Sequence, residues 1–111
     1  MEGFKEKPVV FSFQYVIDTV NIYNYGIEVF GGNQAQKYES IIDKITSELA
    51  QSYWMYPECR YILTQSHLYR NIILESHLII YRVKPERIEV LRIIHSSSSI
   101  SRIKDVRKIK I

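Results

Sequence analysis

The side chains best suited to acid–base chemistry lie in the second half of the chain. Histidine changes its charge near neutral pH and is the side chain that most often moves a proton in enzymes. The chain has three histidines, His67, His77 and His95. Hydroxyl and cationic side chains also occur in this region, at Tyr81, Arg70, Arg82 and Arg92. Side chains of these types can act as a general acid or base and can stabilise developing negative charge.

The spacing of these residues does not predict a metal site. His67 and His77 are ten positions apart and His95 lies eighteen further on, whereas zinc sites usually contain one closely spaced ligand pair. The single cysteine, Cys59, excludes an internal disulfide and a cysteine-based zinc site. The sequence also lacks a phosphate-binding glycine loop and a G-x-S-x-G motif. We therefore expect no metal and no cofactor.

The stretch that ends on His95 allows two interpretations. Its sequence, YRVKPERIEVLRIIHSSSS, places two apolar segments on either side of KPER, where Pro85 favours a turn. Either His95 lies at the rim of a catalytic site, or it ends one strand of a hairpin.

The pairing of the two segments favours the second interpretation. In one register Val83 pairs with Ile88. Arg82 then faces Glu89, which neutralises it, and Arg92 lies on the opposite face. The cations do not converge in this register, although a shift of one residue would reverse the conclusion. We expect His95 to end a strand, and the candidates for catalysis remain His95, Arg82, Arg70 and Tyr81.

The elements that would position these residues begin with a short strand and two helices. Residues 8–13 are short and β-branched, as in a strand. Two glycines, Gly31 and Gly32, end the first helix, and Asn33 is expected to cap the second, with Gln36 completing a capping box. So short a loop predicts an antiparallel helical hairpin. Apolar residues at helical spacing are expected to face the core at Val16, Ile17, Val20, Tyr23, Ile27 and Phe30, and then at Ala35, Tyr38, Ile42, Ile45 and Leu49.

Three strands and a short helix complete the predicted fold. Strands are expected at 68–74, 77–83 and 88–94, and their short connections predict an antiparallel meander. Ser98 or Ser99 is expected to cap a C-terminal helix that docks on the sheet through Ile100, Ile103, Val106 and Ile109. The predicted class is α+β, in the order β-α-α-β-β-β-α, with a small antiparallel sheet packed on a helical hairpin. Residues 1–111 are expected to form a single domain.

Three features suggest contact with a partner. Both faces of the predicted sheet are apolar, with Leu78, Ile80, Leu91 and Ile93 on one and Ile79, Tyr81, Val90 and Ile94 on the other. The helical hairpin covers only one of them, and an uncovered apolar face marks a partner site or self-association. Residues 82–111 hold nine Lys or Arg against three acids, which suits an acidic partner or only a solvated helix. Aromatic residues cluster near the end of the second helix, where they either anchor a partner or cap the core. The partner-binding candidates are Tyr53, Trp54, Tyr56, Arg92, Arg102, Arg107 and Lys108.

The compartment follows from composition. No apolar run approaches the roughly 20 residues that span a membrane. The first eleven residues, MEGFKEKPVVF, contain acids and a proline where a signal peptide has a basic region and an apolar core. We expect a cytoplasmic protein without membrane contact.

Two segments resemble the RelE/ParE family of small bacterial toxins. YGIEVFGGNQAQKY (residues 25–38) resembles the family's helix end, glycine turn and QA-x-x-Y start of the second helix. LIIYRVKPERIEVLRIIHS (residues 78–96) resembles its strand ending Tyr-Arg-Val, its turn and its Ile-x-x-x-Arg-x-x-His pattern. The similarity extends from about Val9 to Val106. It implies a toxin that is neutralised by a cognate antitoxin, in a homodimer or a toxin–antitoxin hetero-oligomer.

The family includes two activities. RelE-like members cut mRNA on the ribosome, whereas ParE-like members act on DNA gyrase by protein–protein contact. A common nuclease pattern has an arginine three residues before the strand tyrosine, where this chain has Leu78. After His95 there is no aromatic residue to stack on a base. The resemblance therefore favours a ParE-like gyrase toxin without enzymatic activity. A ribosome-dependent mRNA endonuclease is the alternative, and an inactive antitoxin-binding or dimeric scaffold is the second.

Overall fold

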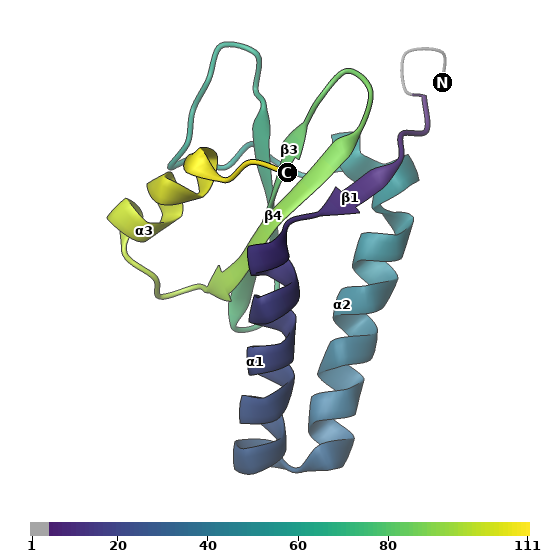
Figure 1. Ribbon diagram of the computed structural model, residues 1–111, viewed down its shortest axis with the longest axis vertical. Helices are drawn as coiled ribbons and strands as arrows, with labels where there is room; N and C mark the ends of the chain where they lie inside the picture. The colour runs from purple at the N-terminus through teal and green to yellow at the C-terminus, as the bar shows by residue number, and fades with distance from the viewer. Residues whose placement is uncertain (1–4) are drawn as a thin grey trace.

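The computed structural model describes residues 5–111, and its element order confirms the predicted α+β fold (Figure 1). Residues 1–4 lie outside the described range. The predictions of a single domain over residues 1–111 and of a first segment unlike a signal peptide included them. The elements are β1 (Val9–Phe11), α1 (Phe13–Phe30), α2 (Gly32–Ser52), β2 (Tyr69–Ile73), β3 (His77–Val83), β4 (Ile88–His95) and α3 (Ile100–Asp105), with 3-10 turns at Tyr53–Met55 and Val106–Lys108.

Helices α1 and α2 form the expected antiparallel hairpin (Figure 1). The Ser12 side chain caps α1 by accepting a hydrogen bond from the Tyr15 amide. Gly31 ends α1 with φ at 90°, a conformation that favours glycine. The prediction that Asn33 caps α2 was wrong. Gly31 alone connects the two helices, so α2 begins at Gly32 without a side-chain cap and Asn33 lies in its first turn.

The sheet has the order β1-β4-β3-β2 and is mixed, because β1 pairs with β4 in parallel. The β2-β3-β4 meander is antiparallel, as expected. Of the registers left open, the structure has the one with Val83 opposite Ile88 and Arg82 opposite Glu89. An irregularity in this ladder, where Ile80 pairs with Arg92 and Tyr81 with Val90, leaves Leu91 as an extra residue.

This bulge corrects the predicted faces of the last strand. Beyond it, Ile93 packs into the core under the helical hairpin, and Ile94 packs on the opposite side. The prediction had these two residues reversed, because one inserted residue inverts the alternation of every residue that follows.

Within the described residues 5–111 both faces of the sheet are covered, so the prediction of an uncovered sheet face was wrong. The core under the hairpin joins residues of α1 and α2, such as Ile42 and Leu49, to the sheet. On the other face Ile103 and Val106 dock on the sheet as predicted, and Cys59 and Ile62 of the long loop before β2 complete the layer. Ser99 caps α3.

Much of the apolar surface that remains exposed lies on α1. The predicted stripe of α2 packs inward, but the stripe predicted for α1 mostly faces solvent, with Val20 53% and Ile27 41% exposed. The buried side of α1 is instead formed by Tyr15, Ile22 and Gly26. This correction has a simple cause: α1 carries apolar residues on most of its circumference, so their periodicity did not identify the inner face.

Among residues 5–111, no helix has the length and apolar character needed to cross a membrane.

Candidate functional site

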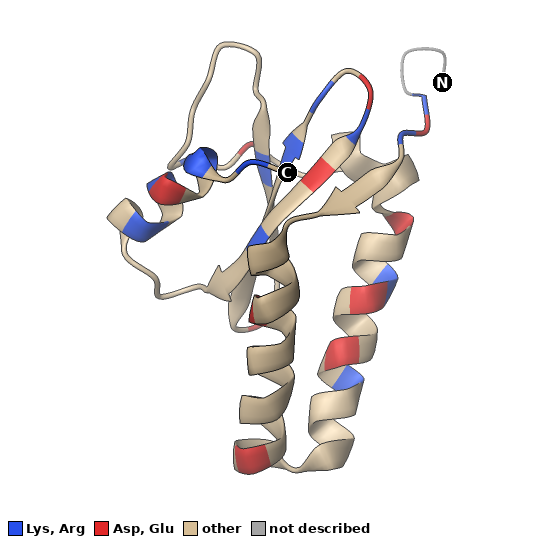
Figure 2. Ribbon diagram, viewed as in Figure 1, with Lys and Arg blue, Asp and Glu red and all other residues tan. Residues whose placement is uncertain are grey.

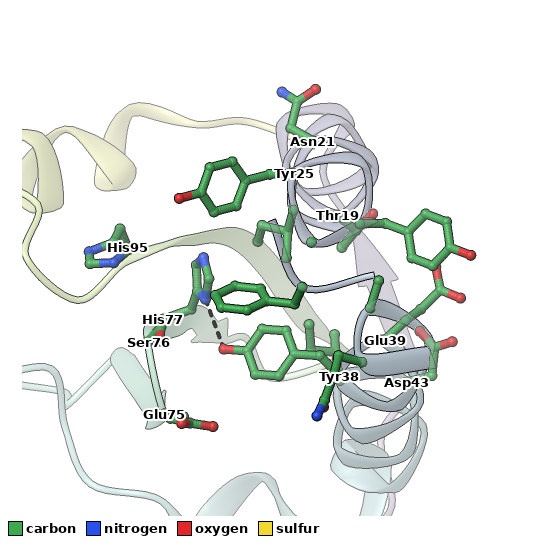
Figure 3. A pocket seen from close by; sticks show the side chains of 17 residues that line it. Thr19, Asn21, Tyr25, Tyr38, Glu39, Asp43, Glu75, Ser76, His77 and His95 are labelled. Carbon is green, nitrogen blue, oxygen red and sulfur yellow. Dashed lines mark hydrogen bonds between the residues drawn. The ribbon is translucent and has the colours of Figure 1, made fainter. Parts of the chain in front are cut away.

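A cavity of about 660 Å³ opens where the helical hairpin extends past the sheet (Figure 3). Its walls come from the second half of α1, the first half of α2, the β2–β3 turn and the end of β4. The close approach of α1 to α2 shapes it, because a Cβ on Gly26 would lie 3.2 Å from the Cβ of Ala35. Exposed aromatic rings at Tyr25 and Phe30 border the opening.

Three titratable side chains meet at one wall of this cavity. The Tyr38 hydroxyl lies 2.8 Å from Nδ1 of His77, and the rings of His77 and His95 meet edge to face with centroids 5.5 Å apart. The two histidines are a cross-strand pair of β3 and β4. On its other side, His95 Nδ1 lies 2.6 Å from the hydroxyl of Ser97.

Burial determines the protonation of His77 and Tyr38. Burial, and then the nearby charge of His95, lowers the pKa of His77, and burial also raises the pKa of Tyr38. Near neutral pH, Tyr38 is therefore protonated and His77 is neutral, so the tyrosine hydroxyl donates to Nδ1. A neutral, hydrogen-bonded pair of this kind is suited to receiving a polar group.

The charge of the cavity is unfavourable for RNA. Glu39, Asp43 and Glu75 line it, and its lining within residues 5–111 contains no lysine or arginine (Figure 3). Cleavage of a phosphodiester needs cations to bind the backbone and stabilise the developing charge. The histidines and tyrosine therefore stand here without the groups that would complete a ribonuclease site.

Arg82, a candidate from the sequence, is held in a buried ion pair. Its Nε lies 2.7 Å from Glu89 Oε1, and it also donates to the carbonyl of Ile109 at 3.0 Å. Arg87 binds the other oxygen of the same carboxylate at 2.6 Å. Burial alone would raise the pKa of Glu89, but the hydrogen bonds from Arg82 and Arg87 hold it below the ordinary value. Arg82 thus fixes the C-terminal segment to the sheet.

The remaining cations also bind the protein's own groups. Arg92 makes a bidentate ion pair with Asp18 of α1, at 2.6 and 2.8 Å. Its partner across the β3–β4 ladder is Ile80, which shares a face of β3 with Arg82, so the predicted placement of Arg92 on the opposite face was wrong. Arg70 donates to the carbonyl of Tyr56 at 2.6 Å. The hydroxyl of Tyr81 is buried and donates to the carbonyl of Tyr53, and burial raises its pKa.

The four catalytic candidates do not converge on one site, although Arg70 and Tyr81 are a cross-strand pair of β2 and β3. Arg82 stands opposite Glu89 near the start of β4, whereas His95 ends that strand. Glu89 and His95 are six residues apart along an extended strand, which corresponds to about 20 Å. Tyr81 points into the core under the hairpin, and Arg70 lies at the β2 edge.

The aromatic candidates occupy two environments. Tyr53 is buried and donates to the carbonyl of Lys5 at 2.8 Å, and Tyr56 packs edge-on against Tyr81. Trp54 is 36% exposed, with its indole nitrogen donating to the carbonyl of Gln51.

The basic candidates of the C-terminal segment lie on the surface (Figure 2). Arg102, Arg107 and Lys108 are exposed, and of these Lys108 lies 3.1 Å from Asp105.

Sequence reasoning missed the cavity and the role of Tyr38 and His77. Tyr38 was predicted as a member of the α2 core stripe and as the tyrosine of the QA-x-x-Y segment, and neither assignment placed it beside a histidine. The meeting of His77 with His95 depends on the bulge, which shifts their pairing by one residue, and no glycine or proline in β4 signals it.

Comparison with known proteins relates this sequence and fold to one family. The family model for the ParE toxin of the type II toxin–antitoxin system parDE matches residues 9–100. A solved structure described as the chromosomal ParDE TA system from P. aeruginosa superposes with a TM-score of 0.66 at 21% identity, covering 81% of this chain and 96% of that one. Among curated proteins there is no match. The chain therefore belongs to the ParE toxin family of type II toxin–antitoxin systems.

Proposed function

We propose that this chain is a toxin that inhibits DNA gyrase by protein–protein contact and that a cognate antitoxin neutralises it. The observation that supports a mechanism without RNA cleavage is that two of the candidate cations bind groups of the chain itself. Arg82 and Arg92 are each bound to a carboxylate of the chain itself. The contact between His77 and His95 lines a cavity whose charged residues, within residues 5–111, are acids. Because gyrase acts on the chromosome, the proposed site of action is the cytoplasm.

One observation favours the alternative of an mRNA endonuclease, which is the contact between Tyr38, His77 and His95. A translating extract tests it. For a gyrase toxin we expect intact mRNA, and His95→Ala should change gyrase inhibition by no more than a few-fold. A general acid or base typically contributes about 10²–10⁴ to a rate. Cleavage of ribosome-bound mRNA that falls by such a factor in His95→Ala would establish the endonuclease instead.

The antitoxin is expected to bind the helical hairpin and the basic C-terminal segment, since both faces of the sheet are already covered. Interfaces of this kind bury about 1,200–2,000 Å². Co-expression with a small acidic protein encoded beside this chain should raise its yield and its melting temperature, because a ligand that binds only the folded state stabilises it. If the neighbouring product neither co-purifies with the chain nor shifts its melting temperature, this part of the proposal fails.

The basic C-terminal segment is expected to speed association. Opposite charges on two surfaces mainly raise the association rate, and salt screens the effect. Changing Arg107, Lys108 and Lys110 together to Gln should slow binding to the antitoxin or target at low salt. The melting temperature should change little, because these side chains are exposed. The defect should shrink as salt rises. Equal association rates for variant and wild type at low ionic strength would show that the segment is only solvated surface.

A further inference from the structure

The outer face of α1 is an apolar stripe with no partner among residues 5–111. Its central line consists of Phe13, Val20 and Ile27, which are 74%, 53% and 41% exposed and stand two helical turns apart. Val16 and Ile17 flank this line and are 49% and 42% exposed, and the exposed Asn24 is a neutral polar residue on the same face. Side chains at spacings of three, four and seven residues share one face of a helix. Such a face is normally buried, and here it is open.

The charges of α1 restrict what can cover this stripe. The helix contains no lysine or arginine, and its acids are Asp18 and Glu28 (Figure 2). Asp18 is already paired with Arg92. An acidic partner would find no cation here, whereas the basic C-terminal segment offers several. The stripe is therefore suited to a second neutral apolar helix.

A second copy of the stripe meets that requirement. Val20 is midway between Phe13 and Ile27, so a two-fold axis at Val20 would place each Phe13 on the Ile27 of the other copy. Such an isologous contact is self-complementary and brings no like charges together. The sheet lies at the N-terminal end of α1 (Figure 1), so an antiparallel arrangement sets the two sheets at opposite ends of the contact.

We infer that two copies of this chain associate through antiparallel packing of their α1 helices about Val20. The exposed fractions of the five side chains correspond to on the order of 500 Å² per chain, so the pair buries about 1,000 Å², the lower limit of a specific interface. The dimer is consequently weak and depends on concentration. This inference does not rest on gyrase as the target.

Sedimentation of the purified chain between about 1 and 200 μM tests the inference, since such a range spans weak protein association. The mass should rise from 13.2 kDa toward twice that value. Val20→Lys should remain at the monomer mass throughout, because it places two like charges at the axis. The matched control is Ile41→Lys, at an equally exposed apolar site on α2, which should associate like wild type. Circular dichroism establishes that both variants are folded.

Oxidative cross-linking tests the orientation. Val20→Cys should form a disulfide-linked dimer, and Phe13→Cys alone should not, because the two copies of residue 13 lie at opposite ends of an antiparallel pair. The native Cys59 is buried and should not react. A monomer at all concentrations, dimerisation that survives Val20→Lys, or efficient cross-linking of Phe13→Cys would each overturn the inference. A monomer in which position 20 becomes protected only on addition of the antitoxin would also overturn it and would assign the stripe to that partner.

Discussion

Replacing Glu89 with alanine is expected to lower the free energy of unfolding by about 3–5 kcal/mol, the usual result of removing one partner of a buried ion pair. Glu89 is 3% exposed and binds Arg82 and Arg87. Without the carboxylate, the buried Arg82 guanidinium loses its counter-charge. Urea denaturation gives the value directly. Asp105→Ala, which removes the exposed pair with Lys108, should cost less than about 1 kcal/mol.

Acid should remove the same contribution from the wild-type protein. The folded-state pKa of Glu89 lies below its ordinary value of 4.5, so the unfolded chain binds the proton first as pH falls. The stabilisation by Glu89 is present above about pH 4.5 and is lost as pH falls through the lower folded-state pKa. The difference between wild type and Glu89→Ala should therefore narrow under acid conditions. A gap that stays constant from pH 6 to pH 3 would contradict this assignment.

The second large effect is expected at Leu49, which is fully buried between α2 and the sheet. Leu49→Ala should lower the free energy of unfolding by about 2–5 kcal/mol, because it removes transfer energy and leaves a cavity. Ile41→Ala is the control on the same helix. Ile41 is 50% exposed, and this change should stay within about 0.5 kcal/mol. Similar losses at both positions would mean that α2 does not pack on the sheet as described.

Much of the fold could be predicted from the sequence because its signals are local. The turn at Pro85 predicted the β3–β4 hairpin, although its register was left open, and the glycines predicted the turn between the two helices. The two glycines did not show which of them ends the first helix. The cap of the second helix was therefore predicted at Asn33, two residues after Gly31, which connects the helices. The sheet's faces were predicted up to Leu91, where the bulge begins.

The incorrect predictions concern features that only the packing of the elements on one another determines. Alternative faces of α1 are both apolar, and only the presence of the sheet decides that Tyr15 and Ile22 pack inward while Val20 stays outside. The cavity depends on how far the hairpin extends past the sheet. It also depends on the pairing of His77 with His95, which no local signal determines. The candidate site was therefore predicted only in part: His95 was identified, but its neighbours were not.

The corrected predictions change both the expected partner surface and the set of groups free for catalysis. In the part of the chain that the structure describes, both faces of the sheet are packed, and apolar surface is exposed on α1 instead. The cations that could have served catalysis bind Glu89 and Asp18. The surfaces left for partners are thus the helical hairpin and the basic C-terminal segment.

Gyrase supercoiling in the presence of the purified chain tests the central claim most directly. Relaxed plasmid, gyrase and ATP are combined with increasing amounts of the chain. We expect supercoiling to be inhibited in proportion to toxin concentration, with His95→Ala acting within a few-fold of wild type and the antitoxin restoring the reaction. Unaltered supercoiling at a large molar excess of folded chain, together with cleavage of ribosome-bound mRNA, would contradict the account.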